Sequence, residues 1–246
     1  MQQLLPIVIL STAAPVIGSL IGVIKRPDDR MIATMLSFAG GVMLAISFLQ
    51  LIPEAIEMAG RVKTIIGVLM GALAMWGIDS LIPHEHTPGA APETSNPSQK
   101  DHSMRRASIY LLAGMFLHNF PEGMAMAIGT IDSQPSSFAV ALAIAIHDIP
   151  EGICTAGPLY MATGKRWRSF FLSSSTALPA VIGFFLAYFM FRTIPLWVVG
   201  MLVAGTAGLM IYITVDELIP LSAKSGHNTI FAFLTGVLLV LCLALL

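Results

Sequence analysis

The sequence predicts an all-α membrane protein, a single domain over residues 1–246 folded as one bundle of eight transmembrane helices. Three observations predict this fold class. Only 11% of the residues are charged and 56% are hydrophobic, whereas soluble domains carry about 25% charged residues. The mean hydropathy of the whole chain is +0.81. Apolar stretches of roughly the 20 residues that cross a bilayer recur from one end of the chain to the other.

Eight apolar stretches define the expected helices. In chain order they lie at about 4–24, 31–55, 62–82, 107–130, 137–163, 169–191, 194–221 and 228–246. The first, second, sixth, seventh and eighth are built around windows without a charged residue, and the third to fifth are apolar runs that hold isolated polar side chains. A signal peptide is the alternative for the first stretch. It has no basic segment before its apolar run and is long enough to span, so we take it as the first helix.

The basic residues set the expected orientation. Ten of the 13 Lys and Arg fall in one set of alternate loops, and the other three, Arg61, Lys63 and Arg192, fall in the opposite set. The positive-inside rule places the richer set in the cytoplasm, so both termini are expected outside it. The longest connection, about 83–106, is rich in Pro, Ser and Gly and is expected to be a flexible cytoplasmic loop. Its His84 and His86 either bind metal loosely or are simply solvated.

The overall charge argues against some functions. The formal net charge of −1 lacks the basic excess of a nucleic-acid-binding protein. The two cysteines, Cys154 and Cys242, lie far apart in apolar runs, so no disulfide framework is predicted.

Two similar hexads place ionisable residues inside the fourth and fifth stretches. Residues 118–123 read HNFPEG and residues 147–152 read HDIPEG. Each hexad begins about halfway along its helix, and consecutive spans run antiparallel, so the two can meet near the bilayer midplane. Ionisable residues at that depth are costly and indicate function by default.

The spacing within each hexad favours a shared site. His118 and Glu122, like His147 and Glu151, are four residues apart and so lie on one face of a helix. The proline of each hexad removes a helical hydrogen bond and is expected to kink its helix. The carbonyls that this releases need partners, which a water-filled or ion-lined cavity provides.

Imidazoles and carboxylates that face one another form a divalent-metal site. This ligand set suits Zn, Fe, Co, Ni and Mn, and the lack of thiolates argues against copper(I). The alternative is a hydrogen-bonded pair of polar helices without a ligand, which two hexads at matched depth make the less favoured reading. The expected ligands are His118, His147, Glu122, Asp148 and Glu151, and Asn119 points toward a neighbouring part of the same cavity.

Other polar residues are weaker candidates. Gln50, Asp216 and Glu217 either line an ion path or lie near an interface. Glu54, near the outer end of the second stretch, is expected to be a solvated helix end, and Asp79 is expected to be interfacial.

These features resemble the ZIP (Zrt/Irt-like) family of metal transporters. The resemblance rests on the eight spans, the loop before the fourth and the two hexads, and it covers the whole chain. The run AGPLYMATGK at 156–165 is most similar to the bacterial ZupT/GufA branch.

The resemblance implies a function and a site. It implies transport of Zn²⁺, or of Cd²⁺, Fe²⁺, Mn²⁺ or Co²⁺, into the cytoplasm across a cell membrane, with the bacterial inner membrane expected. The hexad His, Asn, Asp and Glu residues would be the ligands, and the fourth and fifth helices would be enclosed by the others. The resemblance also implies that one bundle slides against another.

The sixth stretch departs from the family. Many relatives carry a Glu there in a Ser-Gly-x-x-Glu motif that completes a second metal position. The run SSSTALPAVIG from Ser173 has no carboxylate, and Leu178 to Ala180 occupy the matching place. Relatives also often have His near Gln50. We therefore expect one complete central site.

The alternatives belong to other functional classes. The chain has no Walker A motif, so ATP is not expected to drive transport. Neither the Glu-x-x-His of di-iron bundles nor the His-Glu-x-x-His of zinc peptidases occurs. An enzyme is therefore not expected, and a membrane metal sensor is a further alternative. A metal-selective channel is the nearest competitor to a carrier. The expected partners are divalent metal ions and the lipid bilayer, with no nucleic acid and no organic cofactor, and a homodimer stays open.

Overall fold

The computed structural model of the protein describes residues 4–81, 109, 112–124, 126–127, 136–190, 194–223 and 227–244, and every regular element among them is helical. The predicted all-α class is therefore confirmed for this part of the chain. The side chain of His147 and the loop residues His84 and His86 lie outside the described part.

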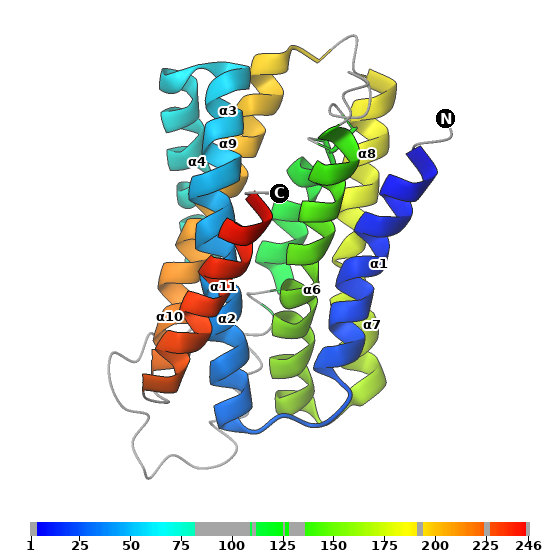
Figure 1. Ribbon diagram of the computed structural model, residues 1–246, viewed down its shortest axis with the longest axis vertical. Helices are drawn as coiled ribbons and strands as arrows, with labels where there is room; N and C mark the ends of the chain where they lie inside the picture. The colour runs from blue at the N-terminus through cyan, green and yellow to red at the C-terminus, as the bar shows by residue number, and fades with distance from the viewer. Residues whose placement is uncertain are drawn as a thin grey trace.

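The described helices follow one another closely along the chain (Figure 1). They are α1 (Leu4–Gly22), α2 (Asp29–Ile46), η1 (Ser47–Leu51), α3 (Ile52–Ala59), α4 (Arg61–Leu81), an unlabelled helix over 112–124, α6 (Ser136–Thr163), α7 (Arg166–Ser174), α8 (Ala177–Met190), α9 (Leu196–Ile213), η2 (Thr214–Leu218), α10 (Ile219–Ala223) and α11 (His227–Ala244). The elements η1 and η2 are single π-helical turns that continue α2 into α3 and α9 into α10.

Local chemistry sets several of the helix ends. The Asp28 carboxylate caps the start of α2 by accepting a hydrogen bond of 2.7 Å from the backbone N–H of Met31. Gly60 and Gly164, with φ of 79° and 65°, end α3 and α6 in a conformation that side chains disfavour. Both turns lie where the sequence predicts a loop.

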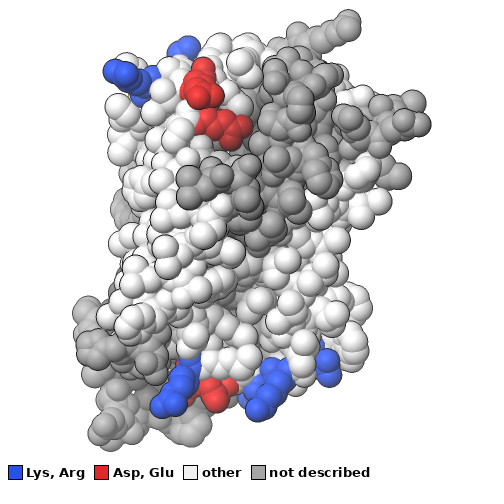
Figure 2. Space-filling view, viewed as in Figure 1, with Lys and Arg blue, Asp and Glu red and all other residues white. Residues whose placement is uncertain are grey.

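Among the residues that the structure describes, four helical stretches are long and apolar enough to cross a membrane. They are Asp29–Ala59, Arg61–Ser80, Arg166–Met190 and Leu196–Ala223. On the face drawn in Figure 2, described charged side chains gather toward the two ends, and the described residues between them are neither Lys, Arg, Asp nor Glu. The division into eight spans, the proline kinks and the outward termini remain predictions.

The helices form two packed groups (Figure 1). In one, α1 packs along α6 and against α7 and α8; in the other, α4 packs along α9, and α11 along α2. Glycines allow the closest approach in each group: a side chain on Gly152 would collide with the α1 backbone at Pro15, and one on Gly71 with the Gly205 carbonyl. Contacts between α2 and α6 join the two groups.

Candidate metal centre

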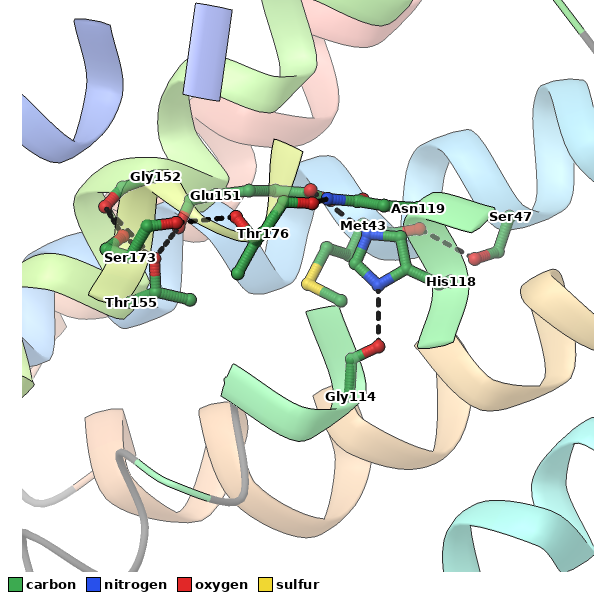
Figure 3. A network of polar contacts seen from close by, with 10 residues as sticks. All are labelled: Met43, Ser47, Gly114, His118, Asn119, Glu151, Gly152, Thr155, Ser173 and Thr176. Atoms are coloured by element: carbon green, nitrogen blue, oxygen red, sulfur yellow. Dashed lines mark hydrogen bonds and ion pairs between the residues drawn. The ribbon is translucent and has the colours of Figure 1, made fainter. Parts of the chain in front are cut away.

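His118 is the centre of the polar network drawn in Figure 3. Its side chain is fully buried, with 0% exposed. The Nδ1 atom lies 3.1 Å from the Gly114 carbonyl oxygen, and Nε2 lies 3.0 Å from Oε2 of Glu151. The carbonyl can only accept, so Nδ1 carries the proton that it donates. In metal sites, the ring N–H of a ligating histidine commonly donates in this way to a backbone carbonyl or a carboxylate, which fixes the orientation of the ring.

The His118–Glu151 contact joins the two hexads. His118 lies on the helix over 112–124 and Glu151 on α6, 33 residues later, and both are buried. The sequence predicted that these hexads meet at one level, and the structure brings these two residues together. Zinc bonds of about 2.0–2.2 Å to each atom would set them roughly 3.4 Å apart. The present 3.0 Å contact would need to widen by only a few tenths of an ångström.

Asn119 presents an oxygen in the same network. Its Nδ2 donates a hydrogen bond of 2.7 Å to the Thr176 carbonyl, which fixes the orientation of the amide. Its Oδ1 and the Oε1 of Glu151 are buried and accept no hydrogen bond from the residues that the structure describes. Buried acceptors without a donor are costly, and a cation would satisfy both.

Two further buried carboxylates lie near His118. Glu122 and Asp148 are buried, at 3% and 5% exposed, and both lie within electrostatic range of His118. Several buried carboxylates repel one another unless a cation or protons neutralise them. The described acidic members of both hexads are therefore buried near His118, where a cation would offset their charge.

The described side chains do not by themselves complete a ligand set. Among them, no three His, Cys, Asp or Glu are arranged to hold a metal ion. His147, the remaining hexad residue, has its side chain outside the described part. The six-residue ligand set therefore stays a prediction.

The weaker candidates lie in or beside the two π-helical turns. Gln50 is in η1 and partly buried; Asp216 and Glu217 are in η2, where Glu217 is buried. Each turn closes with a backbone hydrogen bond to the residue five positions earlier. The N–H of Ile52 donates to the Ser47 carbonyl, and the N–H of Ile219 donates to the Thr214 carbonyl. Such turns are frequent at functional sites, and the role of these side chains in an ion path stays a prediction.

Sequence analysis missed the π-helical turns, although a pattern for them exists. Residues 48–53 read FLQLIP and residues 215–220 read VDELIP. The tripeptide Leu-Ile-Pro therefore comes directly after Gln50 in the first segment and directly after Glu217 in the second. A proline lacks the N–H that would bond four residues back, which favours a local change of helix type. Gln50 and Glu217 are equivalent in this repeat.

Two other acidic residues have polar or charged neighbours. Glu54 is partly buried and lies within electrostatic range of Glu122, so it is more than a solvated helix end. Asp79 accepts a hydrogen bond of 3.3 Å from the hydroxyl of Tyr212. In α8, Leu178, one of the residues expected at the place of the family's glutamate, is 57% exposed.

Comparison with known proteins decides the family. The chain matches the family of ZIP zinc transporters over residues 3–97 and 79–244. It belongs to the ZIP family. It is 34% identical over 226 residues to the zinc transporter ZupT of Salmonella arizonae, which covers 89% of this chain and 86% of that protein. It is also 34% identical over 234 residues to ZupT of Salmonella heidelberg, covering 92% and 90%.

These similarities confirm the resemblance seen in the sequence, including its ZupT branch. They make this ZIP protein a transporter of divalent metal, with zinc as the cargo of its relatives, and not an enzyme. The membrane metalloenzyme is thereby set aside.

Proposed function

We propose that this ZIP protein carries divalent metal ions, Zn²⁺ foremost, into the cytoplasm through one central site between its two hexads. The ligands are the six hexad residues His118, Asn119, Glu122, His147, Asp148 and Glu151. Cd²⁺, Fe²⁺, Mn²⁺ and Co²⁺ suit the same donors. Transport takes place across a cell membrane, the inner membrane in a bacterium, without ATP.

The observation that carries the proposal is the buried contact between His118 and Glu151. It links the two hexads through an imidazole nitrogen and a carboxylate oxygen. The acceptor atoms of Asn119 and Glu151 that lack a donor in the described part support a cation at this place. Metal binding would release protons from these groups, since a ligand must be deprotonated.

The distribution of charge supports inward transport. The described cations at the α1–α2 and α6–α7 ends are Lys25, Arg26, Arg30, Lys165, Arg166 and Arg168. Only Arg61 and Lys63 lie at the start of α4, at the opposite end. With the richer end in the cytoplasm, a dication that enters gains about 4.6 kcal/mol per 100 mV of membrane potential.

Uptake of ⁶⁵Zn²⁺ into proteoliposomes tests the site. Glu151→Gln keeps the size of the side chain but removes the charge that faces His118, so we expect uptake to fall by about 10- to 100-fold. Glu57→Gln, an exposed carboxylate at the end of α3, is the matched control and should leave uptake unchanged.

Uptake at the wild-type rate by the double variant Glu122→Gln, Glu151→Gln would contradict the proposal. The concentration dependence of the wild-type flux separates a carrier from a channel. Saturation at a slow turnover supports the carrier, and a flux that does not saturate supports the channel.

A further inference from the structure

An apolar groove opens on the side of the bundle where the two groups of helices meet. It has a volume of about 340 Å³ and lies between α2, α6 and α11. Its lining residues are Thr34, Met35, Phe38, Pro150, Ile153, Ala232 and Thr235. Thr34 and Thr235 are exposed and Pro150 is buried, so the groove deepens toward α6.

The residues that line the groove do not favour bound water. The Thr34 hydroxyl donates to the Arg30 carbonyl at 2.9 Å, and the Thr235 hydroxyl donates to the Phe231 carbonyl at 2.8 Å. With its hydroxyls satisfied, the groove presents hydrocarbon. Water needs two to four polar partners to stay in a cavity, and an unfilled gap forfeits dispersion contacts.

The position of the groove along α2 places it within one leaflet. That helix begins at Asp29, so Thr34 and Phe38 lie about 8 and 14 Å along it at 1.5 Å per residue. One leaflet contributes roughly 15 Å of hydrocarbon. Lipid acyl chains are the apolar molecules present at that depth.

Positive charge lies at the membrane-surface end of the same groove. Lys25, Arg26 and Arg30 are exposed between α1 and the first turn of α2. Arg30 precedes Thr34 by one helical turn. The Arg26 guanidinium donates a hydrogen bond of 2.9 Å to the Met161 carbonyl near the end of α6.

The acidic residues of this segment leave a net positive charge. Its three cations outnumber Asp28 and Asp29, and Asp28 caps α2. Figure 2 shows Lys and Arg, with a smaller acidic patch among them, at this lower end.

We propose that this groove binds one anionic phospholipid from the leaflet on the side of the α1–α2 turn. An acyl chain lies against Phe38, Pro150 and Ile153, and the phosphate lies between Arg26 and Arg30. Basic pockets between membrane helices bind anionic headgroups in this way. The proposal depends only on insertion in a bilayer and stands whether or not the metal site is correct.

Native mass spectrometry of the full chain in detergent tests the proposal. The protein is titrated with phosphatidylglycerol and, separately, with phosphatidylcholine. We expect one phosphatidylglycerol to be retained in preference to phosphatidylcholine. Ala232→Leu and Thr235→Leu fill the groove at two places and should each abolish this retention. Ala74→Leu adds the same side chain on the exposed face of α4 and should not.

Removing a positive charge tests whether the arginines bind the lipid headgroup. Arg30→Gln should weaken phosphatidylglycerol binding by roughly fivefold without changing phosphatidylcholine binding. Arg61→Gln, an exposed arginine at the opposite end, is the control. Equal retention of both lipids would overturn the proposal, as would unchanged retention by a folded groove-filling variant.

Discussion

Asn119 shows how a single side chain can connect the site to its support. One end of its amide donates to the Thr176 carbonyl between α7 and α8, and the other end is a buried acceptor next to the hexads. Asn119 is one of the six ligands predicted from the sequence, and that role stays a prediction. The sequence could not reveal the anchor, because Thr176 is 57 residues away and its contribution is a backbone oxygen.

The substitution Asn119→Asp separates the two roles of this residue. A carboxylate cannot donate to the Thr176 carbonyl, so the metal-free protein should lose about 1–3 kcal/mol of stability. The added charge should strengthen zinc binding, so zinc should raise the Tm of the variant more than that of the wild type. Thermal unfolding in detergent with and without zinc measures both. An unchanged metal-free Tm, or an equal zinc shift, would contradict this account.

The sequence predicted the surroundings of some single residues and not of others. The repeat of the hexads and their matched depth predicted that the two hexads can meet, and His118 of one contacts Glu151 of the other. Glu54 was expected to be solvated because it lies near a helix end, yet it is partly buried within electrostatic range of Glu122. Its surroundings depend on how α3 packs, which spacing along one helix does not give.

At the scale of elements, apolar length predicted the helices but not their interruptions. The sixth expected stretch, 169–191, is divided into α7 and α8 by a turn at Ser175 and Thr176. The backbone N–H of Leu178 bonds there to the Ser175 carbonyl at 3.0 Å. Both this turn and the π-helical turns change hydrogen-bond register without changing hydropathy, so a hydropathy pattern cannot show them.

The contact between α1 and α6 offers a sharp test of packing. Gly152 follows Glu151, and a methyl group there would collide with the backbone of α1 at Pro15, Ser19 and Gly18. Gly152→Ala should therefore destabilise the protein by about 1–3 kcal/mol. Gly77→Ala in α4 meets no atom within 4 Å and should be neutral or stabilising by up to about 1 kcal/mol. Thermal unfolding compares them, and equal Tm values would refute the close packing.

At the scale of the whole molecule, two groups of helices meet around the hexads. The α1–α6 group supplies Glu151, and α2 and α9 belong to the other group. The lateral groove lies along the same junction, where α2 and α11 face α6. The proposed metal ligand Glu151 and the groove residues Pro150 and Ile153 therefore belong to the same segment of α6.

The orientation of the whole bundle is a prediction that follows from charge alone. Glu57, at the end of α3, and Lys165, between α6 and α7, are exposed at opposite ends of the molecule. If the basic end is cytoplasmic, a cysteine at 57 should react with a membrane-impermeant maleimide in intact cells. A cysteine at 165 should react only after the membrane is opened.

The two native cysteines need not interfere with this labelling. Cys154 is buried and its thiol donates to the Met35 carbonyl, so it should stay unreactive; Cys242 is exposed and is changed to Ser. Glu57→Cys and Lys165→Cys are then compared in Cys242→Ser protein that still takes up zinc. Labelling at 165 but not at 57 in intact cells would reverse the orientation. The phospholipid proposed for the groove would then belong to the outer leaflet, because the groove and its arginines turn with the bundle.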